Sequence, residues 1–405
     1  MSYETYRVAD LIDEIAMGPF GSNIKVSCFV DSGVPVLNGS NLEGFSLSEK
    51  AFRYVTEEKA DSLNKANAHR GDIVITHRGT LGQIVFIPQD SRYDRYVISQ
   101  SQFRVRCNDK VLPEYLVYYF HTPIGQYKLL SNASQVGVPA LARPSSTFQQ
   151  IEVTLPELSI QKRVVEIITT IQRKIENNQE LNDNLEQQAV ALFKSWFVDF
   201  SLFGGTVPEN WEDTTLENIT TLITRGIAPK YSDNSDQTVV NQKCIRNHTI
   251  DLSLARTHTP KAINEKWLKF GDLLINSTGD GTLGRVAQVW FTPKALTVDS
   301  HVTIVRPARE ELIFYIGLWG ILHEKEIESL HTGSTGQTEL PRDRVKMLKL
   351  LLPDDSSLSR FNSIIAPMAS TIISNQEENQ KLASLRDTLL PKLMSGEIDV
   401  SNIQL

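Results

Sequence analysis

One segment of this 405-residue chain matches a nucleotide-binding motif letter for letter. Residues 279–284 read Gly-Asp-Gly-Thr-Leu-Gly, the G-x-G-x-x-G pattern whose glycines let the backbone approach a dinucleotide pyrophosphate. That chemistry requires a helix directly after the glycines, because the helix N-terminus faces the phosphates. Residues 285–291 (Arg-Val-Ala-Gln-Val-Trp-Phe) have the composition of a strand instead. The sequence therefore predicts a tight turn between two strands at this place.

A second candidate for chemistry is Glu57-Glu58-Lys59, which resembles half of a metal-dependent nuclease set of Asp and Glu-x-Lys. It has no counterpart in the second half of the chain, and the pattern favours an exposed helix face. The sequence contains no Asn-Pro-Pro-aromatic or Asp-Pro-Pro-aromatic tetrapeptide for adenine methylation, no phosphate loop, no His-Glu-x-x-His and no Gly-x-Ser-x-Gly. Binding without catalysis is the favoured interpretation, and a DNA-processing nuclease is the alternative.

The chain repeats itself at a period of about 200 residues. Gly-Asp followed by three aliphatic residues occurs at 71–75 and again at 271–275, and Leu-Pro at 155–156 returns at 352–353. A repeat this long indicates two copies of a whole domain with an appendage rather than a solenoid of small units. Two copies imply two equivalent binding events.

Polar loops lie at equivalent places in the two copies but differ in sequence. Residues 76–80 (Thr-His-Arg-Gly-Thr) correspond to 276–280 (Asn-Ser-Thr-Gly-Asp), and residues 132–137 correspond to 333–338. Arg, Asn, Gln and His side chains reach base edges of DNA, while Ser and Thr suit phosphates. One scaffold with two different sets of polar residues predicts the reading of two different short DNA sequences.

The candidate DNA-binding residues follow from these loops and their polar neighbours. In the first copy they are Asn38, Asn41, Thr76, His77, Arg78, Thr80, Gln100, Ser134, Gln135 and Arg143. In the second copy they are Lys243, Arg246, Asn276, Ser277, Thr278, Arg285, His301, Thr335, Gln337 and Thr338. We expect no catalytic residue and no metal ligand in this chain.

The local charge pattern supports this interpretation, although the net charge does not. The net charge is −7, which by itself disfavours a nucleic-acid partner. Residues 65–106, however, contain seven Lys or Arg against three Asp, and residues 243–269 contain six against two acids, a local +4 in each copy. Because the excess recurs, it predicts an electrostatic footprint for DNA in each half.

The elements that must position these residues alternate between strand-rich and helical stretches. We predict two strand-rich domains, at residues 1–155 and 206–353, and two helical spacers, at 156–205 and 354–405. Strands are expected at 34–37, 72–76, 83–87, 102–106 and 151–155, with short helices at 113–121 and near 57–67, and the second domain repeats that order. The fold class is therefore α+β.

The helical spacers carry matching heptad seams, offset by 197 residues, over 159–197 and 357–394. Each seam places two asparagines at the same positions, Asn178 and Asn182 in the first and Asn375 and Asn379 in the second. An antiparallel coiled coil in which facing numbers sum to 557 pairs Asn178 with Asn379 and Asn182 with Asn375. Asparagine on an apolar seam costs stability but fixes the register. We expect this pair of helices to be related by a pseudo-twofold axis.

Apolar residues remain outside the seam, and they predict a protein interface. The strongest candidates are Phe193, Phe197, Leu390 and Met394, which we expect to be exposed when the chain stands alone. No apolar run reaches the roughly 18 residues of a membrane span, and the N-terminus lacks signal-peptide features. The three cysteines are far apart in the sequence, which supports neither a disulfide framework nor a zinc cluster. We expect a cytoplasmic protein without contact to a membrane.

Four segments in this order resemble the DNA-specificity (S) subunit of Type I restriction-modification systems. They are residues 34–41 (Val-Pro-Val-Leu-Asn-Gly-Ser-Asn), the Leu155-Pro156 step into the first spacer, residues 194–200 (Lys-Ser-Trp-Phe-Val-Asp-Phe) and residues 389–397 (Leu-Leu-Pro-Lys-Leu-Met-Ser-Gly-Glu). The resemblance covers essentially the whole chain, as two target-recognition domains alternating with two helical spacers.

This resemblance implies a non-catalytic reader of a bipartite site in double-stranded DNA, with one half-site for each recognition domain. Two methyltransferase (modification) subunits and restriction/translocase subunits are the implied partners. S-adenosylmethionine, ATP and Mg²⁺ are expected in those partners, and no cofactor is expected on this chain. A reader for another methylation-linked defence system is a second alternative, because it would share the fold and the DNA binding.

Overall fold

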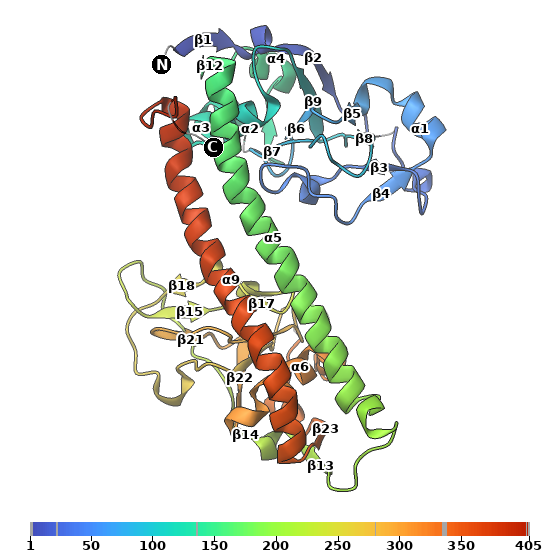
Figure 1. The fold of residues 1–405 in the computed structure, drawn as a ribbon, viewed down its shortest axis with the longest axis vertical. Coiled ribbons are helices and arrows are strands. Elements are labelled where there is room, and N and C mark those ends of the chain that lie inside the picture. Colours follow the sequence, from blue (N-terminus) through green and yellow to red (C-terminus); the bar gives the residue numbers. More distant parts are fainter. Residues whose placement is uncertain are drawn as a thin grey trace. The chain divides into compact units, whose positions relative to one another are not determined.

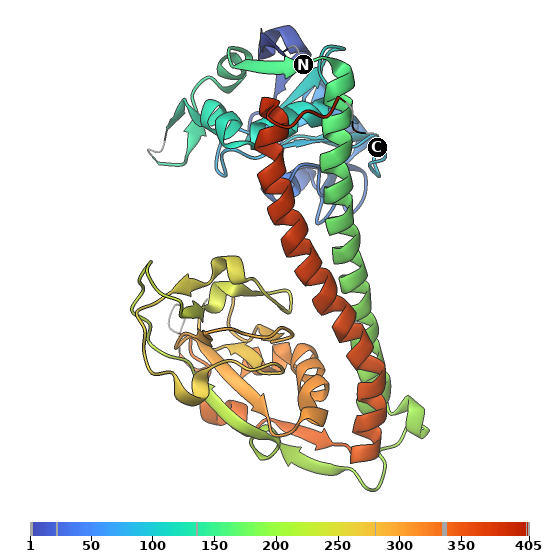
Figure 2. The same cartoon turned by 60° about the vertical axis from the view of Figure 1, so that its left-hand side comes forward.

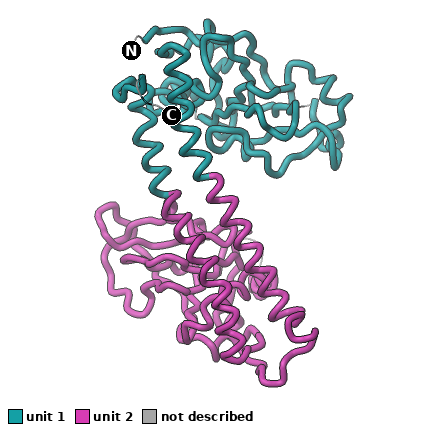
Figure 3. Tube along the Cα trace, viewed as in Figure 1, with its two compact units in different colours: residues 1–175, 380–405 teal, residues 176–379 magenta. Residues whose placement is uncertain are grey.

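The computed structural model describes residues 3–21, 23–134, 137–279, 281–333, 338–401 and 403. It divides into two compact units, unit 1 with residues 1–175 and 380–405 and unit 2 with residues 176–379 (Figure 3). Both boundaries fall inside the long helices α5 (Leu158–Phe197) and α9 (Asp355–Ser395). Each unit therefore combines a strand-rich part with a segment of each long helix.

Unit 1 contains two four-stranded sheets (Figure 1). The central sheet is antiparallel, in the order β2 (Ile12–Met17), β9 (Gln102–Cys107), β6 (Ile73–Thr76) and β7 (Ile84–Phe86). The second sheet has the order β4 (Arg53–Val55), β3 (Val34–Val36), β8 (Arg95–Val97) and β5 (Asn67–His69). Two-stranded pairs are formed by β1 (Tyr3–Arg7) with β12 (Glu152–Pro156), and by β10 (Ala133–Ser134) with β11 (Ala140–Leu141). The short helices are α1 (Glu57–Ser62), α2 (Pro113–His121), α3 (Pro123–Leu130) and α4 (Pro144–Gln149).

Unit 2 repeats this topology. Its central antiparallel sheet has the order β14 (Thr220–Arg225), β22 (Val302–Pro307), β19 (Leu273–Asn276) and β20 (Val286–Gln288). A second sheet contains β18 (Arg256–Thr257), β15 (Thr238–Val240) and β21 (Leu296–Val298). Strand β13 (Glu212–Thr215) pairs with β23 (Lys349–Leu352), and β16 (Ile245–Arg246) pairs with β17 (Thr249–Ile250). The short helices are α6 (Ile313–Leu322), α7 (Glu324–Ser329) and α8 (Arg342–Lys346).

The register of the central sheets shows that the sequence repeat is a structural repeat. Ile73 faces Val105 in unit 1, and Leu273 faces Val305 in unit 2. The glycine motif at 279–284 lies between the antiparallel neighbours β19 and β20, and no helix follows it. Gly281 and Gly284 have positive φ angles there, as Gly79 and Gly82 do in the first copy. The predicted strand-to-strand turn is therefore confirmed.

The central strands are apolar along their whole length because both of their faces are covered. Ile73 and Ile75 pack with the side chains of α2, whereas Val74, between them, packs with the second sheet. In unit 2, Leu273 and Ile275 face α6 in the same way, and Leu274 faces the other core.

Helices α5 and α9 run antiparallel and lie side by side in both views (Figures 1 and 2). In unit 1, Val164 near the start of α5 shares a core with Leu393 near the end of α9. In unit 2, the rings of Trp196 and Phe361 are 5.5 Å apart. These contacts confirm the predicted antiparallel coiled coil. Among the described residues, no helix is both long enough and apolar enough to cross a membrane.

The Gly-Asp step of each repeat holds a buried ion pair. Asp72 is fully buried, and its carboxylate accepts hydrogen bonds from Arg104 (3.3 Å) and Arg106 (2.9 Å) on the neighbouring strand β9. Asp272, also fully buried, is held by two nitrogens of Arg306 at 2.8 and 2.7 Å. The two aspartates therefore link β9 and β22 to the turns that precede β6 and β19.

Candidate nucleic-acid interface

Three loops of unit 1 meet at the ends of β6 and β9. The backbone N–H of His77, after β6, donates to the carbonyl of Ser101, before β9, at 2.8 Å. The N–H of Leu141 donates to the carbonyl of His77, and that of Gly79 donates to Pro139, both at 2.9 Å. The turn after β6 is thus held between the turn before β9 and the β10–β11 loop.

A fourth segment, around Gly39, is linked to these loops by the side chain of Gln83. Gln83 donates from Nε2 to the carbonyl of Gly39 at 3.0 Å, and its Oε1 accepts from Thr76 Oγ1 at 3.1 Å. Gly39 begins a short 3-10 helix, Gly39–Leu42, that Asn38 caps by accepting the N–H of Ser40. Together we call residues 38–42, 76–83, 99–101, 133–134 and 137–143 loop cluster 1.

Unit 2 builds the equivalent cluster with other residues. The N–H of Ser277 donates to His301, and the N–H of Leu340 donates to Ser277, each at 2.8 Å. Thr278 Oγ1 lies 3.1 Å from Gln242 Oε1, in the 3-10 helix Gln242–Cys244, and 2.7 Å from His301 Nδ1. We call residues 241–246, 276–279, 281–285, 299–301 and 338–340 loop cluster 2.

Most of the predicted residues present their side chains at these clusters. Exposed ones are Arg78, Thr80, Gln100, Ser134, Arg143, Lys243, Arg246 and His301, and partly exposed ones are Asn38, His77, Thr278, Arg285 and Thr338. His77 Nε2 lies 3.2 Å from the carbonyl of Gln100, and burial lowers the pKa of its ring. The ring is therefore neutral at pH 7 and offers a hydrogen bond rather than a charge. Gln135, Thr335 and Gln337 lie outside the described residues.

Four predicted residues have a different role. Asn41, Thr76, Asn276 and Ser277 are buried. Asn41 donates to the carbonyls of Ser48 and Lys50 at 2.9 and 2.8 Å, and Asn276 donates to that of Gln242 at 3.0 Å. These side chains are buried and donate hydrogen bonds inside the domain, so we reassign them from DNA contact to support of the loops.

The charge count of the first copy needs a correction. Of the seven bases in 65–106, Arg104 and Arg106 together bind Asp72 and Glu14, while Arg70 pairs with Asp94 at 3.1 Å. Arg95 pairs with Asp61 at 2.6 Å and with Glu57. Three acids outside the counted range, Glu14, Glu57 and Asp61, cancel most of the apparent +4, because the fold brings β2 against β9 and α1 against β8. Arg78 remains as an exposed cation within loop cluster 1.

The basic side chains of the second segment, residues 243–269, are more exposed and less often paired with acids. Lys243, Arg246, Arg256, Lys261 and Lys269 are exposed, and no ion pair within 4.0 Å links them to an acid of the described chain. Lys266 is the exception, since its Nζ donates to the carbonyl of Gly226 at 3.0 Å. Arg256 stacks on the ring of Tyr231, 3.6 Å from its centroid. Unit 2 therefore carries the stronger positive surface.

The nuclease alternative finds no support at its predicted residues. Glu57 and Asp61 both bind Arg95, so these two carboxylates of α1 share a cation from the protein itself. The N–H of Lys59 donates to Thr56 Oγ1 at 3.2 Å as part of a helix cap. In the described residues, no group of three or more His, Cys, Asp or Glu side chains has the arrangement of a metal site.

The expected exposure of the partner-interface residues is wrong. Phe193, Phe197, Leu390 and Met394 are all buried, because each packs into the core of its own unit. The long helices do expose other apolar side chains. Leu181, Ile364 and Leu385 are 45%, 41% and 47% exposed.

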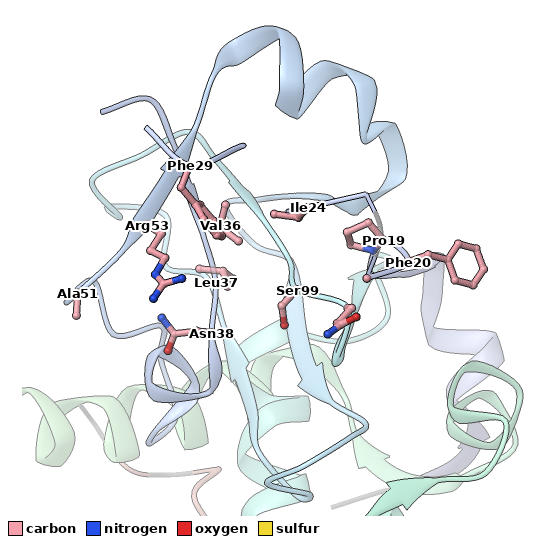
Figure 4. Close-up of a pocket in the computed structure, with 12 residues that line it drawn as sticks. Pro19, Phe20, Ile24, Phe29, Val36, Leu37, Asn38, Ala51, Arg53 and Ser99 are labelled. Atoms are coloured by element: carbon pink, nitrogen blue, oxygen red, sulfur yellow. The ribbon is translucent and has the colours of Figure 1, made fainter. Parts of the chain in front are cut away.

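The sequence analysis did not predict a cavity that lies beside loop cluster 1. A cavity of about 460 Å³ is lined by Phe20, Ile24, Phe29, Arg53, Asn38, Gln100 and their neighbours (Figure 4). Asn38 and Gln100 belong to loop cluster 1, whereas Phe20 and Arg53 come from outside it. The Gly-Pro-Phe-Gly sequence at 18–21 was the available signal, since a Gly-Pro dipeptide marks a turn.

Comparison with known proteins gives one consistent result. The family described as Type I restriction modification DNA specificity domain matches residues 4–187. The Type I restriction enzyme MjaIX specificity subunit of Methanocaldococcus jannaschii is 24% identical, over 97% of this chain and 93% of the relative. The HindI specificity subunit of Haemophilus influenzae is 22% identical, over 81% of this chain and 87% of the relative.

The fold agrees with these sequence relatives. The crystal structure of the Type I restriction-modification S subunit from M. genitalium covers 97% of this chain and 96% of its own, with a TM-score of 0.59 and 14% identity. The family match stops within the first long helix, but unit 2 repeats the topology of unit 1. Residues 4–187 therefore match the Type I restriction modification DNA specificity domain, and along its length the chain is similar to the specificity (S) subunits of Type I restriction-modification systems.

Proposed function

We propose that this chain selects the DNA target of a Type I restriction-modification enzyme, and that each strand-rich domain reads one half of a bipartite site. The supporting observation is the pair of loop clusters, which occupy the same place in the same topology but present different side chains. Equivalent scaffolds with different polar residues are suited to two different half-sites.

The recognition domains in this proposal are residues 1–155 and 206–353, joined by the helical segments 156–205 and 354–405. Each domain contains a complete pair of sheets. The chain itself is the non-catalytic subunit of a multisubunit enzyme. It assembles with modification and restriction subunits, and we assign S-adenosylmethionine, ATP and Mg²⁺ to those partners.

Two modification subunits per chain follow from the repeat, because two similar surfaces offer two similar docking sites. Leu181, Ile364 and Leu385 on the long helices are exposed apolar residues suited to such contacts. The modification subunits then methylate adenine in the half-sites that this chain has selected.

A domain exchange tests the proposal. Residues 1–155 are replaced by the corresponding domain of another specificity subunit, and the methylated motif is determined by methylome sequencing of the host. We expect one half of the motif to change while the other half is retained. A change in both halves, or in neither, contradicts the assignment of one half-site to each domain.

A further inference from the structure

We propose that Phe20 and Gln100 together recognise one A·T base pair of the first half-site, Gln100 through the adenine edge and Phe20 through the thymine methyl group. This inference rests on the proposed function and adds a specificity-determining residue that the loop pattern did not include.

Phe20 is the most exposed large apolar side chain among the described residues, at 84%. An exposed aromatic ring on a single loop has no core to fill. In Figure 4 its ring points away from the other labelled side chains of the cavity. The ring is therefore available to a partner rather than to this domain.

The backbone around Phe20 is fixed against loop cluster 1. The N–H of Gly18 donates to the carbonyl of Gln102 at 2.8 Å, and a Cβ at Gly18 would come within 1.9 Å of the carbonyl oxygen of Ser99. On the other side of Phe20, a Cβ at Gly21 would come within 2.2 Å of Gln100 Oε1. The two glycines let the loop lie directly against residues 99–102, so Phe20 is held beside Gln100.

This juxtaposition matches the chemistry of one base pair. An A·T pair shows N7 and the N6 amino group of adenine in the major groove, together with O4 and the 5-methyl group of thymine. A glutamine amide forms two hydrogen bonds with the adenine edge, and an apolar ring covers the thymine methyl. Gln100 is exposed and carries the amide that this contact requires.

The loop cluster around this pair argues for DNA as its partner. Gln100 also contacts His77 through its carbonyl, at 3.2 Å, next to the exposed Arg78. Asn38 and Arg53, which carry further hydrogen-bond donors, line the same cavity as Phe20. The loop that carries Phe20 therefore adjoins hydrogen-bond donors that are suited to base edges and phosphates.

The equivalent loop of unit 2 offers a contrast. Gly226 has the same close approach as Gly18, since a Cβ there would come within 1.9 Å of the carbonyl oxygen of Val298. It is followed by Ile227, which is buried, and the nearby Tyr231 is covered on one face by Arg256. The inference therefore applies to the first half-site alone.

The experiment uses the specificity subunit assembled with its modification subunits and a duplex carrying the target motif. Each thymine of the first half-site is replaced in turn by deoxyuridine, which removes only the methyl group. For the wild type we expect one substitution to weaken binding about fourfold, the loss for one buried methyl group. Phe20→Ala should weaken binding of the unmodified target to a similar extent and should show no further loss with that deoxyuridine. Phe20→Leu should keep part of the effect.

Val26→Ala is the matched control, because Val26 follows in the same part of the chain, is 80% exposed and does not line the cavity. It should keep both the wild-type affinity and the deoxyuridine effect. The inference is overturned if Phe20→Ala binds like the wild type. It is also overturned if Phe20→Ala binds more weakly but retains every deoxyuridine effect, which would indicate insertion between bases or contact with a modification subunit. Absence of target binding by the wild type would instead contradict the proposed function.

Discussion

Asp72 and Asp272 occupy the same position in the two units, and each binds arginine from the neighbouring strand. Both carboxylates are fully buried. Breaking a buried pair by removing one partner leaves a charge without compensation, which costs far more than the intact pair contributes. The Gly-Asp step is thus retained in both copies for a structural reason, and its arginines are not free for phosphates.

We expect Asp272→Asn to lower the free energy of unfolding by about 3 kcal/mol, because the guanidinium of Arg306, only 11% exposed, loses its anion. Asp94→Asn is the control, since Asp94 is 90% exposed and pairs with a surface arginine. The control should change stability by less than about 1 kcal/mol. Chemical denaturation of the two variants measures both effects, and equal losses would show that the burial of Asp272 has no special cost.

The exposed arginines of the loop clusters are the residues to test for DNA contact. Arg78→Ala and Arg246→Ala should each weaken binding of the target duplex. If the arginine contacts phosphate, the slope of log K against log salt concentration should become smaller by about one. If it contacts a base, the substitution should cost about 1–3 kcal/mol of binding free energy at one position of the site.

Arg173→Ala serves as the control for charge alone, because Arg173 is exposed on α5 and outside both clusters. Titration of wild type and variants with DNA at several salt concentrations separates these cases. Unchanged binding for both cluster variants would move the reading surface elsewhere.

At the scale of elements, the two long helices are aligned by amide pairs. Asn178 Nδ2 donates to Asn379 Oδ1 at 2.9 Å, and Asn375 Nδ2 donates to Asn182 Oδ1 at 2.8 Å. Asn178 also donates to Glu378 at 2.8 Å and is almost completely buried. Any shift of one helix along the other would leave these amides without partners.

Asn178→Leu should therefore destabilise unit 2 by about 1–3 kcal/mol, because the amide of Asn379 loses the partner that faces it. The double variant Asn178→Leu/Asn379→Leu should recover most of that loss, since two leucines restore an apolar seam. Thermal unfolding of the two single variants and the double variant measures the coupling. Additive losses would argue that the pair does not act as a unit.

A second element-scale link joins the β16–β17 hairpin to α5. His248 Nδ1 lies 2.7 Å from Glu186 on α5, and Nε2 lies 3.6 Å from Glu324 on α7. The hydrogen bond to Glu186 raises the pKa of His248. A raised pKa in the folded state stabilises the fold below the unfolded value of about 6.5 and ceases to do so as pH rises through the folded value.

We expect the melting temperature of the wild type to exceed that of His248→Gln at pH 5.5. The difference should disappear as pH rises through the raised pKa, because both side chains are then neutral. His331→Gln is the control, since His331 is exposed and bonds only to a backbone carbonyl in the described structure. A difference that grows with pH would have the wrong sign for this ion pair.

At the scale of the whole molecule, the packing of the two long helices decides which apolar side chains stay exposed for a partner subunit. The seam and the two domain cores use Phe193, Phe197, Leu390 and Met394, so those side chains are not available to another subunit. Leu181 and Leu385 remain half exposed on α5 and α9.

We expect Leu181→Asp and Leu385→Asp to reduce co-purification with the modification subunit, because a charge at an apolar contact is costly to desolvate. Gln188→Asp is the control, since Gln188 is an exposed polar position on α5. Circular dichroism should remain unchanged in all three variants. Two-to-one assembly in both leucine variants would place the docking surface elsewhere.

The sequence was informative where a pattern is local. The heptad seams predicted α5 and α9 to within two residues at each end, and the repeat predicted the matching sheets. Burial could not be predicted at the helix ends, because Phe193 and Met394 pack on domains whose contacts are distant in sequence. The same limit applies to Asn41 and Asn276, whose amides point inward. For the same reason, the pairing of Arg95 with Asp61 on α1 could not be predicted from the sequence.

The division of the chain into units has a consequence for its synthesis. Unit 2 is one continuous stretch, residues 176–379, whereas unit 1 is completed only by residues 380–405. A chain that leaves the ribosome N-terminus first can therefore close its second unit before its first. Leu390, Leu393 and Val400 fill the same core as Val164 and Ile168. That core is incomplete until residues 390–400 have been translated, so unit 1 begins to emerge before unit 2 but is completed after it.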